Sequence, residues 1–211
     1  MITSEIITNF ELFVDDTTEL SAQEELSLAN KIYRRVLNYR PWEFLKKEAT
    51  GTLSTSVAYV SLPADFAYMA ENNQYTNNSA AIDNNASPKV VFVGTNYNPY
   101  QIINFSDRRQ YRNQAGYAYI DIVNSRLVFT AQPTAAESYE FDYIHNPADL
   151  TTATSPIFPS RFHEIIYHGM ASEDYIIQQF DKAKSYVVEN QNKYLDYLRD
   201  MSYWNSQLIN N

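Results

Sequence analysis

The sequence has no cysteine and almost no glycine: its 211 residues include 0 Cys and 4 Gly. Without cysteine the chain cannot form disulfides, iron–sulfur clusters or thiolate zinc sites, and it has no thiol nucleophile. Four glycines are too few for a phosphate-cradling loop, and neither a G-x-x-x-x-G-K-S/T nor a G-x-G-x-x-G string occurs. We therefore expect no nucleotide chemistry and no cofactor.

Positive charge and long apolar runs are also scarce. Lys and Arg total 16 against 25 Asp and Glu, and the resulting net charge of −9 argues against wrapping duplex DNA by counterion release. The apolar runs are far shorter than a membrane span, and Met1–Phe10 carries Glu5 where a signal peptide needs positive charge and an apolar core. We expect a soluble protein, made in the cytoplasm, with no membrane contact.

Aromatic residues are abundant instead. The chain has 18 Tyr, 11 Phe and 2 Trp, whereas charged residues make up only 19%. Tyrosine and tryptophan supply large, rigid contact area, so a surplus beyond what one core can bury indicates interfaces. A tyrosine-rich core with ordinary edges explains the same composition, and both interpretations stay open.

Residues 1–20 are expected to form an acidic N-terminal arm, because they contain no Lys or Arg and their apolar residues keep no single period. A helix should follow, since Ser21 and Glu24 have the spacing of a capping box. Apolar residues then recur at threes and fours, as a buried stripe requires, until Arg40-Pro41 ends the helix.

From about Thr50 to His145 the sequence is typical of strands and turns, with β-branched and aromatic residues in short runs between Asn, Gly and Pro. Asn124-Ser125 fits a tight hairpin turn. Glu71 to Ser87 is expected to be a mobile surface loop, and Ser106 to Arg112 a short helix or a loop. The expected strands are Val57 to Leu62, Lys89 to Val93, Tyr117 to Val123, Arg126 to Thr130 and Ser138 to Ile144.

The C-terminal part is expected to be helical from Pro159-Ser160 to about Ser202, with a break near Asp181. Helical ends that flank a β-rich segment predict an α+β fold: a helical bundle, made of one N-terminal helix and a C-terminal helix pair, carrying an inserted β-rich module of sandwich or barrel type. The expected domains are the arm at 1–20, a helical domain at 21–48 and 156–202, the β-rich module at 49–155 and a C-terminal tail at 203–211.

One string resembles a zinc-peptidase helix. Zinc binding needs two histidines at i and i+4, about 40° apart around the helix axis, whereas His163 and His168 are five residues apart and therefore about 140° apart. The chain has only 3 His and no Ser in a nucleophile-elbow context. It therefore offers few residues from which a hydrolase triad could be built. We expect no metal site and no enzyme, and a zinc hydrolase remains an alternative only through this string.

The densest basic cluster consists of Arg108, Arg109 and Arg112 with Tyr111. Nucleic-acid binding would need more such residues on the same face. The cluster is therefore either a solvated patch or a docking site for an acidic neighbour, such as the acidic arm of an identical subunit. Heterologous contacts of that kind close into rings.

Four apolar residues are expected in the fold core instead of an interface: Trp42, Phe44, Leu62 and Phe66. They flank the corner between helix and strand where the two layers must meet. Truncating Trp42 should therefore unfold the subunit.

Several motifs follow one another in a fixed order between about Ser21 and Met201: Arg40-Pro41-Trp42-Glu43-Phe44-Leu45, Ser61-Leu62-Pro63-Ala64-Asp65-Phe66, Gly116-Tyr117-Ala118-Tyr119-Ile120-Asp121, Tyr143-Ile144-His145-Asn146-Pro147 and Phe158-Pro159-Ser160-Arg161-Phe162-His163. Their order and spacing resemble the head-to-tail adaptor, or connector, proteins of tailed bacteriophages. The Asn- and Tyr-rich composition is similar to ring proteins in the tails of crAss-like phages.

The resemblance implies a structural virion protein and no enzyme. Such proteins form a ring, usually twelvefold, that joins the portal of the phage head to the tail, and the genome passes through its lumen without specific binding. The implied partners are identical subunits, the portal protein and neighbouring tail or ring proteins, after synthesis in the host bacterial cytoplasm. The arm, with Phe10 and Phe13, and the tail, with Tyr203 and Trp204, are then expected to contact neighbouring rings or the portal.

A recognition module is the competing class. A glycan-binding or host-surface tail protein would use Tyr and Asn on β-loops for stacking and hydrogen bonding. Composition alone leaves this alternative open.

Overall fold

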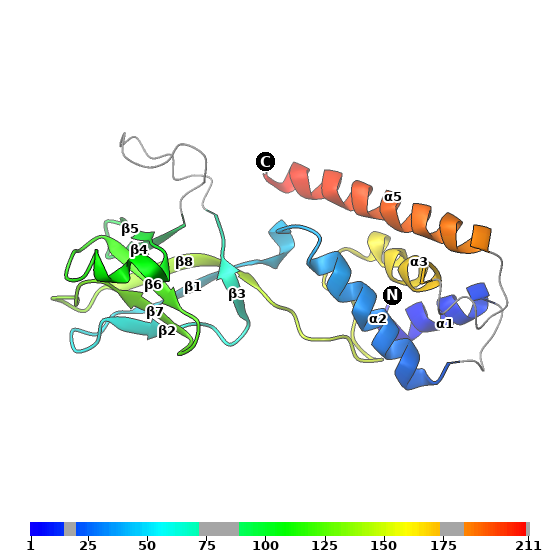
Figure 1. The fold of residues 1–211 in the computed structure, drawn as a ribbon, viewed down its shortest axis with the longest axis horizontal. Helices are drawn as coiled ribbons and strands as arrows, with labels where there is room; N and C mark the ends of the chain where they lie inside the picture. The colour runs from blue at the N-terminus through cyan, green and yellow to red at the C-terminus, as the bar shows by residue number, and fades with distance from the viewer. Residues whose placement is uncertain (15–19, 72–88, 174–183, 210–211) are drawn as a thin grey trace. The chain divides into compact units, whose positions relative to one another are not determined.

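The computed structural model describes residues 1–14, 20–71, 89–173 and 184–209. The chain divides into a helical unit, Met1–Phe44 with Pro147–Asn211, and a β unit, Leu45–Asn146 (Figure 1). The architecture is mixed α+β, and the β unit is inserted between the two segments of the helical unit. The sequence analysis placed the ends of this insertion at 49 and 155.

Four α-helices make up most of the described part of the helical unit: α1 (Thr3–Val14), α2 (Ala22–Leu37), α3 (Glu164–Ala171) and α5 (Lys184–Ile209). Two short 3-10 helices accompany them, η1 (Glu43–Leu45) and η3 (Ser160–Phe162). Contacts to α1, α2 and α5 surround α3, and its side chains Ile165, Ile166 and Met170 are fully buried. α3 is therefore the centre of this unit's core.

The start of α2 follows from its capping residues. The Ser21 hydroxyl accepts a hydrogen bond from the Glu24 amide at 3.4 Å, and the Glu24 carboxylate accepts one from the Ser21 amide at 2.9 Å. The predicted capping box is therefore confirmed. The stripe that follows is buried along the whole helix: Leu28, Ala29, Ile32, Tyr33, Val36 and Leu37.

The expected N-terminal arm is wrong for most of its length, because Thr3–Val14 forms α1. Ile6, Phe10 and Val14 recur at intervals of four and are buried, which is the pattern of a helix with one apolar face. The neighbouring apolar residues Leu12 and Phe13 lie off this stripe and hide its period in the sequence. The Thr3 amide also donates to the Thr154 carbonyl at 2.8 Å, so α1 is tied to its own chain.

The expected C-terminal tail is also wrong, because α5 continues to Ile209. Its buried side includes Asn190, Tyr194, Leu198, Met201 and Asn205. The Asn205 side chain accepts a hydrogen bond from the Glu43 amide at 2.8 Å. Because Asn205 is polar, the apolar periodicity of the sequence does not reveal that the helix stays packed as far as this residue. The expected break at Asp181 lies outside the described residues.

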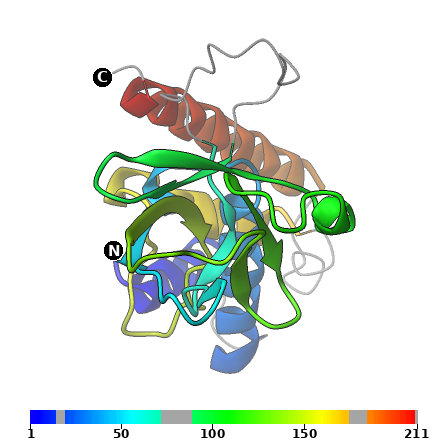
Figure 2. The ribbon, with the colours of Figure 1, turned by 90° about the vertical axis from the view of Figure 1, so that its left-hand side faces the viewer.

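The β unit contains one curled sheet (Figure 2). Its strands are β1 (Lys46–Thr52), β2 (Tyr59–Ser61), β3 (Phe66–Met69), β4 (Val90–Val93), β5 (Asn98–Ile102), β6 (Tyr117–Asp121), β7 (Arg126–Phe129) and β8 (Ser138–His145). The order is β1-β8-β4-β5-β6-β7-β2, with β3 also paired to β8. All pairs are antiparallel except β5 with β6. Among the described residues the eight strands form a single sheet, so two separate packed sheets are not present there.

Five of these strands, β2, β4, β6, β7 and β8, fall at predicted runs, whereas β1, β3 and β5 do not. The sequence of β1, KKEATGT, is polar, and Pro99 lies inside β5, where proline argues against a strand. The β6–β7 connection is a hairpin, with Asp121 paired to Arg126. Ser106 to Arg112 overlaps a 3-10 helix, η2 (Phe105–Arg109), and the expected loop after Glu71 lies outside the described residues.

The concave side of the sheet holds the core of the β unit: Leu53, Met69, Val91, Val93, Ala118, Leu127, Phe129, Phe141 and Tyr143. At Gly51 the packing is close, because a Cβ there would meet the Tyr139 hydroxyl oxygen at 2.7 Å.

The four expected core residues belong to two separate cores. Trp42 is fully buried in the helical unit, its indole donates to the Val36 carbonyl at 2.8 Å, and Phe44 stacks on it at 5.6 Å between ring centroids. Leu62 and Phe66 are half-buried against the core of the β unit. Trp42 and Phe44 thus belong to one unit, and Leu62 and Phe66 to the other.

Candidate assembly surfaces

Two of the three histidines belong to the interior of the helical unit and have structural partners there. The His163 Nε2 donates to the Phe158 carbonyl at 2.9 Å. The His168 Nδ1 donates to the Asn190 side-chain oxygen at 2.9 Å, since the amide nitrogen of Asn190 itself donates to the Tyr186 carbonyl. Burial lowers the pKa of both imidazoles, which favours their neutral form.

The third histidine lies in the β unit, where the His145 Nδ1 is 2.8 Å from the Leu45 carbonyl oxygen. Within the described ranges, no group of three His, Asp or Glu residues could hold a metal ion. The histidine string at 163–168 thus takes part in packing the helical unit.

An ion-pair cluster joins α2 to the end of α3. Glu173 accepts from Lys31 at 2.7 Å and from Arg35 at 2.8 Å. Burial raises the pKa of the Glu173 carboxyl, but hydrogen bonds from the two cations outweigh it, so the pKa lies below its usual value. These charges neutralise one another within the chain, while the Lys31 and Arg35 side chains stay partly exposed.

A second polar cluster lies in the β unit. Tyr143 donates to Asp65 at 2.9 Å, and Lys47 contacts the other Asp65 oxygen at 2.7 Å. Burial and the adjacent carboxylate raise the pKa of Tyr143 to about 12, and the hydrogen bond from Lys47 lowers that of Asp65. The cluster ties β1 and β8 to the turn before β3.

The basic cluster predicted from the sequence lies at η2 and the turn after it. Arg108 is held against its own chain, because its guanidinium lies 3.8 Å from the Phe105 ring centroid and donates to the Phe105 carbonyl at 2.6 Å. Tyr111 packs on Tyr117, with centroids 4.4 Å apart. Arg109 and Arg112 are exposed, and neither has an ion pair among the described residues. These two arginines are the part of the cluster that is open to a partner.

The four terminal aromatic residues differ in their accessibility. Phe10 is fully buried, so its expected interface role is wrong. Phe13 is half-buried and packs against Tyr167, His168 and Tyr186, while Trp204 is half-buried against Phe44 and Phe162. Tyr203 is 71% exposed and is the one member of this set that presents its ring to solvent.

The sequence analysis missed the apolar tip of the β6–β7 hairpin. Ile122 is 64% and Val123 92% exposed, while Asn124 donates to the Asp121 carboxylate at 2.8 Å and closes the turn. The sequence analysis expected the strand to continue to Val123, so it placed Ile122 and Val123 in the sheet. The strand β6 ends at Asp121 instead. Two adjacent exposed aliphatic side chains at a hairpin tip are a candidate contact site.

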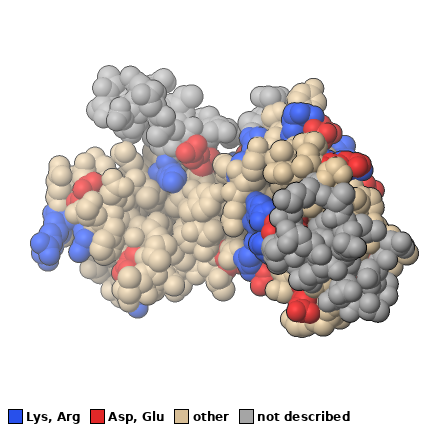
Figure 3. All heavy atoms as spheres, turned by 45° about the vertical axis from the view of Figure 1, so that its right-hand side comes forward, with Lys and Arg blue, Asp and Glu red and all other residues tan. Residues whose placement is uncertain are grey.

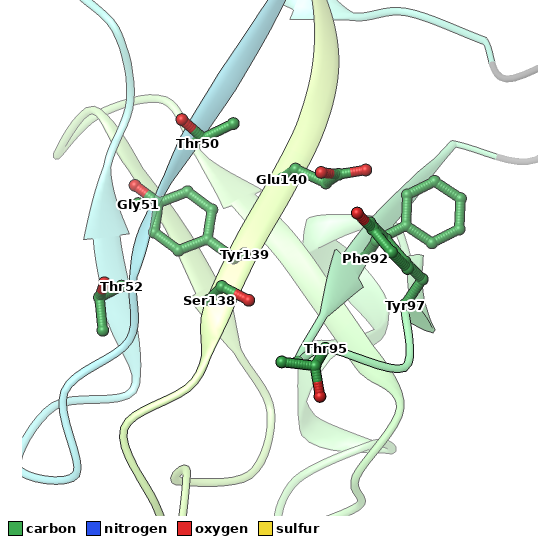
Figure 4. A pocket seen from close by; sticks show the side chains of 10 residues that line it. Thr50, Gly51, Thr52, Phe92, Thr95, Tyr97, Ser138, Tyr139 and Glu140 are labelled. Atoms are coloured by element: carbon green, nitrogen blue, oxygen red, sulfur yellow. The ribbon is translucent and has the colours of Figure 1, made fainter.

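A hollow of about 470 Å³ lies on the convex side of the β unit. Figure 4 shows Thr50 and Thr52 on β1, Ser138 and Glu140 on β8, and the ring of Tyr97 beside Phe92. The rings of Phe92 and Tyr97 meet edge to face, 6.3 Å apart. Hydroxyl groups, one carboxylate and an aromatic pair can bind a polar ligand or accept side chains from another chain.

Charged side chains are sparse over the visible face of the β unit, whereas both signs crowd the visible face of the helical unit (Figure 3). No described helix is both long enough and apolar enough to cross a membrane. The open features described above are a pair of arginines, an aliphatic tip, an exposed tyrosine and a shallow polar hollow. They are candidate surfaces for contacts with other macromolecules.

Comparison with known proteins shows the family to which the chain belongs. The family model described as SU10 adaptor protein matches residues 1–209, so the chain belongs to the SU10 adaptor protein family. It is a structural adaptor of a bacteriophage, a virion component that associates with other phage head and tail proteins. A search of curated proteins finds no match.

Proposed function

We propose that this chain forms a ring that joins the portal of the phage head to the tail and lines the channel through which DNA leaves. The family match over residues 1–209 carries the proposal. A dodecamer is the expected stoichiometry. The narrower proposal, a ring protein of a crAss-like phage made in the host cytoplasm, rests on the Asn- and Tyr-rich composition.

The charge balance supports a channel lining. With a net charge of −9, the ring repels the DNA backbone on average, so a passing genome is not held by counterion release. The basic cluster has only two exposed arginines, Arg109 and Arg112, which are too few to hold DNA. We therefore assign them to contacts with protein.

The open surfaces support contacts with neighbours. We assign Arg109 and Arg112 to an acidic patch of an adjacent protein, because opposite potentials fix register at an interface. Ile122, Val123 and Tyr203 would be covered by the portal or by an adjacent ring. Burial of these three side chains in the assembly would remove exposed apolar surface from water, which favours association.

The location in the virion tests this function. Gold-labelled antibodies against the chain, applied to purified virions, should mark the single vertex where head and tail meet. Antibodies against a major capsid protein are the control and should mark the whole head. Label confined to the tail tip or fibres would overturn the proposal.

A recognition module remains the second candidate, because the hollow offers hydroxyl groups beside Phe92 and Tyr97. Sugar rings stack on exposed aromatic faces, and Tyr97 is 58% exposed. If the chain binds glycans, the full-length protein should bind host surface polysaccharide, and Tyr97→Ala should abolish that binding. Tyr203→Ala is the matched control, because it removes an exposed tyrosine elsewhere.

A further inference from the structure

The strand order of the sheet in the β unit begins with β1 and ends with β2, so each of these strands has an open edge. β3, which among the described residues pairs only with β8, has another. An open edge presents unpaired N–H and C=O groups that can pair with a strand of another chain. Natural proteins protect edges with proline, short strands or bulges. β1 has seven residues, no proline and no register shift against β8, although it begins with two lysines. β2 is short, with three residues.

The hydrogen-bond pattern shows which groups of β1 face outward. The Leu53 amide donates to the Glu137 carbonyl at 2.7 Å, and in an antiparallel ladder every second residue makes such bonds. The backbone groups of Glu48, Thr50 and Thr52 therefore point away from β8. No described residue pairs with them, and all three are exposed.

The same reasoning applies to β2. The Phe129 amide donates to the Ala58 carbonyl at 2.7 Å, and the Leu62 amide donates to the Ser125 carbonyl at 2.9 Å. The backbone groups of Tyr59 and Ser61 thus point away from β7, and within the described ranges they also have no partner. Among the described residues, the strand order thus ends in an open edge at β1 and in another at β2.

The side chains at the two edges lie on the same face of the sheet. The core of the β unit is packed by residues adjacent to the outward positions: Ala49 beside Thr50 on β1, and Val60 and Leu62 on either side of Ser61 on β2. Because side chains alternate along a strand, Thr50 and Ser61 both belong to the convex face. A sheet that continued from β2 of one molecule to β1 of another would keep its core face and its outer face aligned.

The chemistry of the two edges is complementary. Threonines on β1 would meet Tyr59 and Ser61 on β2, and β-branched residues pair well with aromatic or hydroxyl residues across strands. Glu48 is exposed without an ion pair among the described residues, while the Arg126 guanidinium lies 4.0 Å from the Tyr59 ring centroid on the β2 side. The hollow beside Thr50 and Thr52 leaves room for a side chain of the added strand.

We propose that the β1 edge of one subunit pairs with the β2 edge of a second copy of this chain, so that the sheets of neighbouring subunits join. This contact is heterologous, and a heterologous contact whose rotation closes generates a ring. The inference rests on the proposed ring and names the surfaces that build it.

Proline at the outward positions tests the pairing in the full-length protein, assembled on purified portal complexes and viewed by electron microscopy. Thr50→Pro and Ser61→Pro each remove one outward N–H and leave the ladders with β8 and β7 intact. Thr50→Val and Ser61→Thr keep the N–H groups and are the matched controls. Each proline variant alone should lose the ring, and the controls should keep it.

Mixing the two proline variants identifies the partner. Each retains one working edge, and the working edges are complementary, so the mixture should form dimers but no rings. Rings formed by either proline variant alone, with the wild-type circular dichroism spectrum, would overturn the proposal. So would loss of the ring in Thr50→Pro only, which indicates a β1–β1 dimer contact or a strand from another virion protein.

A cross-link keeps the test decisive if a proline variant fails to fold. The chain has 0 Cys, so Thr50→Cys with Ser61→Cys introduces the only pair, and oxidation of the assembled protein should give a ladder of covalent multimers. The single-cysteine variants should give no ladder. No ladder from a double variant that forms rings overturns the edge pairing and leaves the ring standing, whereas absence of wild-type rings on portals overturns the proposed function itself.

Discussion

The helical unit and the β unit differ in which polar groups they leave without a partner. In the helical unit the buried residues His163, His168 and Asn190 all have hydrogen-bond partners. Only the Tyr194 hydroxyl and the Asn205 side-chain nitrogen are buried without one among the described residues. The β unit leaves two strand edges, the aliphatic tip and two arginines open. Both units thus offer surfaces to a partner: the helical unit at exposed side chains such as Tyr203, and the β unit at its strand edges, its hairpin tip and its two arginines.

The largest expected effect is on the core of the helical unit. Trp42→Ala should lower the free energy of unfolding by about 3–5 kcal/mol, because it removes a fully buried indole and leaves a cavity. Hydrogen exchange measured by mass spectrometry should show lost protection in α2 and α5. Tyr203→Ala, at a 71% exposed residue, should stay within about 0.5 kcal/mol. A stable Trp42→Ala protein that merely fails to assemble would contradict the assignment of Trp42 to the core.

A pair of glycine substitutions compares the packing of the two units. A Cβ at Gly169 would collide with the Ile32 side chain and lie 3.1 Å from the Tyr194 ring, so Gly169→Ala should cost about 1–3 kcal/mol by overpacking. At Gly51 the neighbour is the half-buried ring of Tyr139, which can move toward solvent. Gly51→Ala should cost less than about 1 kcal/mol in urea unfolding. Equal costs would show that the β unit is packed as tightly as the helical unit.

Glu25 makes the stability of the helical unit depend on pH. Burial, together with the nearby Glu11 carboxylate, raises its pKa to about 7. The unfolded chain releases this proton near its ordinary pKa, so the contribution of Glu25 to stability falls as pH rises between about 4.5 and 7. The lowered pKa values of His163 and His168 act in the opposite direction. Glu25→Gln should remove this contribution, so that stability falls less, or rises more, with pH than in the wild type, and it should stabilise the protein by about 1–3 kcal/mol at pH 8. Thermal melts across pH measure the effect.

The exposed Glu48 supplies the control for that pH series. Glu48→Gln should leave the slope as it is in the wild type, because this side chain is open to water. An identical slope in Glu25→Gln and the wild type would show that Glu25 is ionised in the folded state.

The smallest effect on stability is expected at the basic cluster. The double variant Arg109→Gln, Arg112→Gln should change the free energy of unfolding by less than about 0.5 kcal/mol, since both side chains are exposed and unpaired. Its assembly on the portal should weaken and lose part of its salt dependence. Arg199→Gln, on the exposed side of α5, is the control and should leave assembly unchanged. Unaltered assembly in the double variant would make the cluster a solvated patch.

The sequence predicted those helices and strands whose formation is determined by residues close together in the chain. The capping box at Ser21 and Glu24 fixed the start of α2, and alternation identified β6 and β8. The sequence could not identify β1, because its polar residues become a strand only when β8 pairs with them. α1 was missed because Leu12 and Phe13 obscure the four-residue spacing that buries Phe10.

The candidate surfaces depend even more on tertiary structure. The sequence located the arginine cluster, but only the fold separates Arg109 and Arg112 from Arg108, which lies on Phe105. The two sheet edges follow from strand order, which joins segments far apart in the chain. No local pattern shows which strand is left at an edge.

The most direct measurement is electron microscopy of the purified protein mixed with portal complexes from the same phage, viewed down the symmetry axis. We expect a ring stacked coaxially on the portal, with density of the β units continuous from subunit to subunit. A protein that stays monomeric and does not associate with the portal would contradict the adaptor function and favour the recognition module.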